Sequence, residues 1–254
     1  MDEKFIFSFK ADLSGVEIPE KLNNPFGSEI PGLGIIAATE FQEYITEESP
    51  KWEHDFRMER GKMFGVLAVQ REDQTLGYIG TISGKLNGKV ICEKFIPSIF
   101  DDLSDQSFID DSMKELKKIS REIDVANSET EVQRLKMKRK EKSVSIQRQL
   151  FAGYEFLNRS GRKKNVLDVF RDASLGNPPS AAGECAAPKL LHFAFKHRLR
   201  PVSLAEFWWG NPLSNKARVH RAFYPACKNK CKPILEFMLE DSGLYERAND
   251  DIEN

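Results

Sequence analysis

The stretch GECAAPKLLHFAFKHRLRPVSLAEFWWG (residues 183–210) decides the fold, together with FYPACKNKCKPILEFM (residues 223–238) after a polar spacer. The whole stretch from residue 183 to residue 238, spacer included, holds three of the four cysteines, three of the four histidines and two of the three tryptophans. Pro188 and the apolar residues after it predict a helix entered at residues 184–187. A strand is predicted over residues 201–210, and Cys227 and Cys231 enter a second helix. Two helix starts therefore present cysteines beside one strand.

Composition describes an ordinary globular chain. Its 254 residues are 40% hydrophobic, enough for one large domain or two small ones. The net charge of -1, with 30% charged residues, excludes a global field that would drive the protein onto nucleic acid. The N-terminus carries acids, and no run of 18 apolar residues occurs anywhere, so we expect a cytoplasmic protein without a membrane partner.

The cysteines suggest a metal site. Without a secretory signal, four cysteines favour reduced thiols, and burial is the simplest reading of Cys92. If the two helix starts converge, Cys185, Cys227 and Cys231 can bind Zn²⁺, with water, Glu184 or His220 in the fourth position. Buried or redox-sensitive thiols are the alternative, because a Cys-x3-Cys pair is less specific than Cys-x2-Cys.

The first hundred residues divide into two parts. Residues 1–60 contain scattered prolines and glycines and are predicted to be an irregular lead-in, with a helix near residues 40–60 that breaks at Pro50. In residues 61–109, apolar runs rich in Val, Ile, Phe and Tyr flank a polar turn at residues 71–75, which predicts a β-hairpin over residues 63–82.

Residues 110–172 are predicted to be an inserted helical arm with a coiled-coil-like antiparallel pair. A capping box at Ser128 and Glu131 marks the second helix, and apolar residues from Val132 to Leu157 follow on a shared face. Basic residues cluster here, which indicates either a solvated helix face or an RNA contact. Trp208, on the strand beyond, is the candidate for stacking on a base, since neighbouring strand residues face opposite ways. The candidate RNA-binding residues are Lys136, Lys138, Arg139, Lys140, Lys142, Arg162, Lys163, Lys164 and Trp208.

The order of hairpin, cysteine-bearing helix, strand and second cysteine-bearing helix resembles the core of the cytidine-deaminase fold. In that family a zinc ligand and a catalytic Glu form H/C-x-E at the first helix start, and Pro-Cys-x-x-Cys opens the second helix. Here Ala187 occupies the Glu position, so the resemblance leaves Glu184 as the proton carrier. Ala226 separates Pro225 from Cys227, and the cysteine spacing is one residue longer than in the family.

Longer phrases resemble the N-terminal extension of certain bacterial RluA-type RNA pseudouridine synthases. They are GKMFGVLAVQREDQTLGYIGTISGKL, FIPSIFDD and the two segments quoted first, and they cover about residues 61–239. The catalytic domain of those synthases carries an H-R-L-D motif whose Asp attacks uridine. The nearest string here is His197 to Arg200, which ends in an arginine that cannot act as a carboxylate nucleophile.

The sequence therefore predicts an α/β or α+β fold: a small sheet covered by two cysteine-bearing helices, a projecting arm, and an acidic tail at residues 241–254. The core combines residues 61–109 and 173–240. The favoured function is an RNA-binding or accessory protein in RNA modification, whose partners are ribosomal or transfer RNA or a separately encoded synthase. The alternative is a zinc-dependent deaminase-like hydrolase that uses Cys185, Cys227 and Cys231, with Glu184 moving protons.

Overall fold

A three-stranded antiparallel sheet forms the centre of the molecule. The computed structural model describes residues 3–86, 92–99, 106–212 and 218–240, so the predicted acidic tail lies outside the described residues. The sheet has the order β2-β1-β5, with β1 at Lys62–Gln70, β2 at Leu76–Ile82 and β5 at Arg200–Trp209. The predicted hairpin and strand are confirmed, as is the mixed α/β class.

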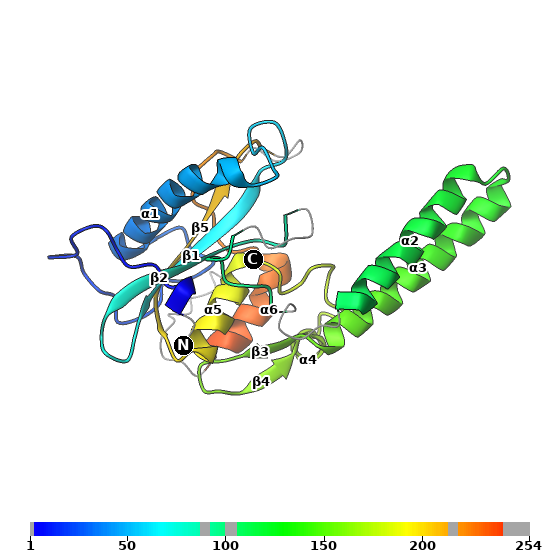
Figure 1. Cartoon of the computed structure of the whole chain (residues 1–254). Helices are drawn as coiled ribbons and strands as arrows, with labels where there is room; N and C mark the ends of the chain where they lie inside the picture. Colours follow the sequence, from blue (N-terminus) through cyan, green and yellow to red (C-terminus); the bar gives the residue numbers. More distant parts are fainter. Residues whose placement is uncertain (1–2, 87–91, 100–105, 213–217, 241–254) are drawn as a thin grey trace, which may run out of the picture.

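Both faces of the sheet are covered by helices (Figure 1). Along β1, Val66 and Ala68 face the helix α1 (Gly32–Glu48), whereas Leu67 and Val69 face α5 (Ala186–Lys196) and α6 (Lys228–Leu239). This alternation follows from the two-residue period of a strand. Because both faces are buried, the strands read as nearly continuous apolar runs.

The helix α1 is an integral layer of the core, so the predicted irregular lead-in is wrong for this part of residues 1–60. Pro31 precedes the helix and Gly34 lies inside it, which made the segment read as a loop. Gly34 is required by packing, since a Cβ there would collide with Ser203 Oγ on β5. The helix ends as expected near Pro50, in the 3-10 turn η2 (Ser49–Lys51); another 3-10 turn, η1 (Glu3–Phe5), opens the chain.

The predicted arm exists as two adjacent helices that project from the core (Figure 1). They are α2 (Gln106–Val125) and α3 (Glu129–Ala152), the latter about 36 Å long at 1.5 Å per residue. Ser128 caps α3 by accepting the N–H of Glu131 at 3.2 Å. None of the helices in the described part of the chain is long and apolar enough to cross a bilayer.

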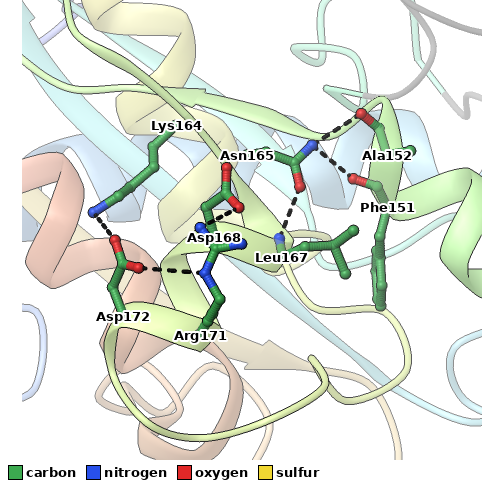
Figure 2. A network of polar contacts seen from close by, with 8 residues as sticks. All are labelled: Phe151, Ala152, Lys164, Asn165, Leu167, Asp168, Arg171 and Asp172. Atoms are coloured by element: carbon green, nitrogen blue, oxygen red, sulfur yellow. Dashed lines mark hydrogen bonds and ion pairs between the residues drawn. The ribbon is translucent and has the colours of Figure 1, made fainter.

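The arm is shorter than predicted, because residues 155–172 belong to the core. They form β3 (Glu155–Leu157), β4 (Lys163–Asn165) and α4 (Val166–Asp172), and α4 and β3 pack against α6. Leu157 therefore lies on a strand, not on the helix face assigned to it. Figure 2 shows how Asn165 joins arm and core: its side chain donates to the carbonyls of Phe151 and Ala152 and accepts the N–H of Leu167.

The two edges of the sheet are covered by other parts of the chain. On β2, Phe7 and Tyr78 exchange two backbone hydrogen bonds of 2.8 and 2.9 Å. On β5, the Asn23 side chain donates to and accepts from the backbone of Leu204, at 3.0 and 2.8 Å. The N–H of Tyr224 donates to the same strand at 2.9 Å. These contacts occupy edge positions that would otherwise be open to another strand.

Candidate metal centre

Three cysteines from two helix starts meet on the α5 face of the sheet. Cys185 is the N-cap residue of α5, Cys227 is the N-cap residue of α6, and Cys231 lies one turn further along α6. The Sγ atom of Cys227 lies 3.9 Å from Cys185 Sγ and 3.3 Å from Cys231 Sγ, and all three sulfurs are within 4.8 Å of one another. Cys231 is buried, Cys185 partly buried and Cys227 exposed, so the cluster opens to solvent on one side.

The start of α5 is held tightly against the sheet. The N–H of Ala186 donates to Ser83 Oγ at 3.1 Å, just beyond the end of β2. The carbonyl of Glu184 accepts the N–H of Gly84 at 2.7 Å. Beneath the helix, Gly65 leaves room for this approach, because a Cβ there would lie 2.6 Å from the Cβ of Ala186. These contacts fix the position of Cys185 relative to β1 and β2.

The spacing of the sulfurs fits a metal ion. A tetrahedral Zn²⁺ with bonds of about 2.3 Å to sulfur requires sulfur–sulfur distances of about 3.8 Å. The separations of 3.3 and 3.9 Å, with the third pair within 4.8 Å, bracket this value. Three thiolates are a donor set that zinc prefers, and the positive ends of two helices stabilise negative sulfur. The three residues therefore fit a zinc ion with one position left for another ligand.

The thiols influence one another's protonation. Contacts with Cys185 and Cys231 lower the pKa of Cys227 to about 2. The contact with Cys227 raises the pKa of Cys185 to about 12, and contacts with both neighbours raise the pKa of Cys231. Without metal, the hydrogen bonds between the thiols therefore favour one thiolate within the cluster.

The acidic side chain beside the cluster is Glu206 on β5, which the sequence analysis did not select. Its Oε1 accepts the N–H of Ala187, two residues after Cys185, at 3.0 Å. Burial raises the pKa of Glu206 to about 7, against the lowering effect of this hydrogen bond, and the charge of Cys227 raises it further. The sequence does contain a feature that could have identified Glu206. It is the single acidic residue in residues 201–210, a strand that is buried on both faces.

The two predicted candidates for the fourth ligand lie elsewhere. The Glu184 carboxylate accepts hydrogen bonds from Ser98 Oγ, at 2.6 Å, and from the Tyr154 hydroxyl. The His220 Nδ1 accepts the N–H of Gly210 at 3.0 Å, beyond the end of β5. Among the described residues, neither belongs to the group of metal-binding atoms formed by the cysteines. Ser98 and Tyr154 engage the Glu184 carboxylate, and the proton-carrying role of Glu184 stays a prediction.

The predicted stacking residue is buried. Trp208 and Trp209 do face opposite sides of the sheet, but only 4% and 5% of their surfaces are exposed. The indole N–H of Trp208 donates to the carbonyls of Gly210 and Asn211, and the Arg218 guanidinium lies 5.7 Å from its ring. Trp208 therefore cannot stack on a base without rearrangement, which corrects its assignment as an RNA contact.

The basic residues divide into paired and exposed ones. On the arm, Arg139 donates to Ser120 Oγ and Lys142 pairs with Glu115, both across the two helices. Lys136, Lys138 and Lys140 are exposed and have no ion-pair partner within the described part of the chain. In the core, three predicted contacts pair with acids: Arg162 with Glu240, Lys163 with Glu155, and Lys164 with Asp172, the last visible in Figure 2.

Comparisons with protein-family models, with curated proteins and with solved structures find no match to this chain. The function of the protein is therefore inferred from the geometry of the three cysteines, from Glu206 and from the surfaces around them.

Proposed function

We propose that Cys185, Cys227 and Cys231 bind a zinc ion and that the protein is a zinc-dependent hydrolase of the deaminase type. The observation that carries this proposal is the convergence of three sulfurs, from two helix starts, within 4.8 Å. Zinc held by three protein ligands activates a hydrolytic water in its fourth position. The partly open cluster leaves that position accessible from solvent.

The order of elements supports the deaminase type. The helix α1, the hairpin β1–β2, the helix α5, the strand β5 and the helix α6 follow one another, with cysteines opening α5 and α6. The part of this order from the hairpin β1–β2 to α6 is the one that resembles the core of the cytidine-deaminase fold. The arm and the β3–β4 unit are insertions between β2 and α5.

Glu206 supplies the carboxylate for proton transfer in this proposal. In the cytidine-deaminase fold the catalytic Glu stands at the position that Ala187 occupies here. Glu206, on β5, lies at the same place because its carboxylate accepts the N–H of Ala187. A buried carboxyl group beside the cluster can hold a proton and pass it to a leaving amine. Its hydrogen bond to a rigid helix start fixes the orientation that such a transfer needs.

Metal content and ammonia release test the proposal. We expect about one zinc per chain in protein purified without a metal-affinity tag, lost in Cys185→Ser and Cys227→Ser. Cys92→Ser is the matched control, because Cys92 contacts the Tyr44 hydroxyl away from the cluster and should leave zinc unchanged. Glu206→Gln should keep zinc and lower ammonia release from cytidine, adenosine or RNA by about 100-fold or more. Protein without metal would refute the site, and zinc-loaded protein without ammonia release would refute the hydrolase.

An RNA-binding accessory role in RNA modification is the second candidate. The observation that favours it is the presence of three exposed lysines, Lys136, Lys138 and Lys140, on an arm that projects from the core. Lysines on an accessible helix neutralise phosphates and give salt-dependent binding. The proposed partners remain ribosomal or transfer RNA, or a separately encoded pseudouridine synthase.

A further inference from the structure

A cleft opens at the end of the sheet, on the side of α1. It has a volume of about 770 Å³ and lies between the end of α1, residues 52–57, the end of β5, and residues 220–221. Its aromatic and charged lining residues include Trp52, Asp55, Arg57, Trp209, His220 and Arg221. A cleft of this size falls in the range of small-molecule sites, and its walls combine aromatic rings with positive charge.

Arg221 is held in an unusual backbone conformation that places its side chain on the cleft. Its φ of 67° lies in the left-handed region, which is unfavourable for a residue other than glycine. Its N–H donates to the Trp208 carbonyl at 2.6 Å, and its carbonyl accepts from Gln42. Its guanidinium donates to Thr46 Oγ1 at 3.0 Å and lies 5.2 Å from the Trp209 ring. Strain that is held by four separate contacts is typical of functional positions.

A second arginine, Arg57, lines the same cleft. Its side chain is exposed and has no ion-pair partner among the residues that the structure describes. The cleft contains one acid, Asp55, whose Oδ1 accepts the backbone N–H of Arg57 at 2.8 Å. With two arginines against one aspartate, the cleft carries a net positive charge, and arginine matches phosphate oxygens through paired N–H donors.

His220 adds a neutral donor and an aromatic surface. Because its Nδ1 accepts the N–H of Gly210, its proton resides on Nε2. Burial, followed by the charge of Arg221, lowers the pKa of His220, so the ring is neutral near pH 7. The imidazole packs edge-on against Trp209 with centroids 4.4 Å apart and is exposed on its other side. Trp52, partly exposed, is a further aromatic residue that lines the cleft.

We propose that this cleft binds a nucleotide unit, with the phosphate on Arg57 and Arg221 and the base against the Trp52 and His220 rings. Planar rings and guanidinium groups together are the chemistry by which proteins hold single-stranded nucleotides. The cleft and the cysteine cluster lie at the same end of the sheet: Ser83, which follows β2, contacts α5 beside Cys185, while Gly210, which follows β5, lines the cleft. The nucleotide is either free or part of a single-stranded RNA whose neighbouring base reaches the cluster. Only this last step rests on the proposed hydrolase function.

Tryptophan fluorescence provides the test, because two of the three tryptophans line the cleft. Cytidine 5′-monophosphate should quench the emission saturably, after correction for its absorbance, and cytidine or inorganic phosphate should bind at least about tenfold more weakly. Arg57→Ala and Arg221→Gly should each weaken binding by about tenfold or more; glycine keeps the left-handed backbone of Arg221. Arg171→Ala, an exposed arginine on α4, is the matched control and should change nothing.

A six-nucleotide single-stranded RNA distinguishes the two sources of the nucleotide. Binding of the RNA more than tenfold tighter than the monophosphate, lost in Arg57→Ala, assigns the cleft to RNA; equal affinities assign it to free nucleotides. Cytidine binding as tightly as its monophosphate, or equal affinities of Arg57→Ala and Arg171→Ala, would overturn the proposal. Cys227→Ser should bind the monophosphate normally, so failure of the zinc site and failure of the cleft are separable.

Discussion

Replacing Gly65 by alanine tests how the sheet positions Cys185. The added Cβ would lie 2.6 Å from the Cβ of Ala186 and 3.1 Å from Leu190 Cδ1. Carbon atoms in contact prefer a separation of about 3.5–4.0 Å, so α5 must move away from β1 by about 1 Å. Zinc–ligand distances tolerate deviations of only about 0.2 Å. The displacement of α5 is therefore several times larger than the change in zinc–sulfur distance that would still allow Cys185 to bind the ion.

We expect Gly65→Ala to lower the free energy of unfolding by about 1–3 kcal/mol, the usual cost of overpacking a core. Each kcal/mol should lower Tm by about 2–4 °C in a protein of this size. The variant should also lose zinc to a competing chelator faster than the unmodified protein. Thermal unfolding by circular dichroism and metal analysis after dialysis against the chelator measure the two effects.

Two other glycines separate local from global effects. Gly80→Ala would press a Cβ into the Phe41 ring on the α1 face, and should cost similar stability while zinc is retained. Gly32→Ala meets no atom within 4 Å and should change neither property. Full zinc retention and an unchanged Tm in Gly65→Ala would refute the reasoning. Equal zinc loss in Gly80→Ala would show that retention follows overall stability, not the placement of α5.

Two further predictions concern charge. Because burial raises the pKa of Glu206 from 4.5 to about 7, its contribution to the stability of metal-free protein is full below pH 4.5 and is lost as the pH rises towards 7. Between pH 5 and 7.5, the free energy of unfolding measured with urea should decline by up to about 3 kcal/mol in the unmodified protein, and this decline should be absent in Glu206→Gln. The same pH dependence in both proteins would contradict this prediction. Replacing Lys136, Lys138 and Lys140 by Glu should weaken RNA binding and flatten its dependence on salt, with unchanged binding excluding the arm as the contact.

Local patterns predicted most of the sheet and both cysteine helices. The hairpin, the strand β5 and the starts of α5 and α6 follow from apolar periodicity and turn residues, which act over short distances. The second half of α1 lies within the helix predicted near residues 40–60, but its first half was not predicted, because Gly34 is a poor helix former. Its place under Ser203 is a tertiary requirement, which periodicity does not contain.

The candidate site was predictable in its residues but not in its arrangement. Spacing placed Cys185, Cys227 and Cys231 on two helix starts, and only the folded sheet shows that these starts meet. Glu184 precedes Cys185 directly in the sequence, whereas Glu206 lies on β5 and accepts a hydrogen bond from Ala187, 19 residues before it. The burial of Trp208 depends on Arg218 and on the backbone beyond β5, which strand alternation alone does not reveal.

The covered edges of the three-stranded sheet limit how this protein can bind other macromolecules. Phe7 occupies one edge, and Asn23 and Tyr224 occupy the other. A peptide therefore cannot join the sheet as an extra strand at these positions without first displacing the chain's own segments, and two copies cannot polymerise there edge to edge. Recognition is left to side chains and to the arm, which stands clear of the core (Figure 1).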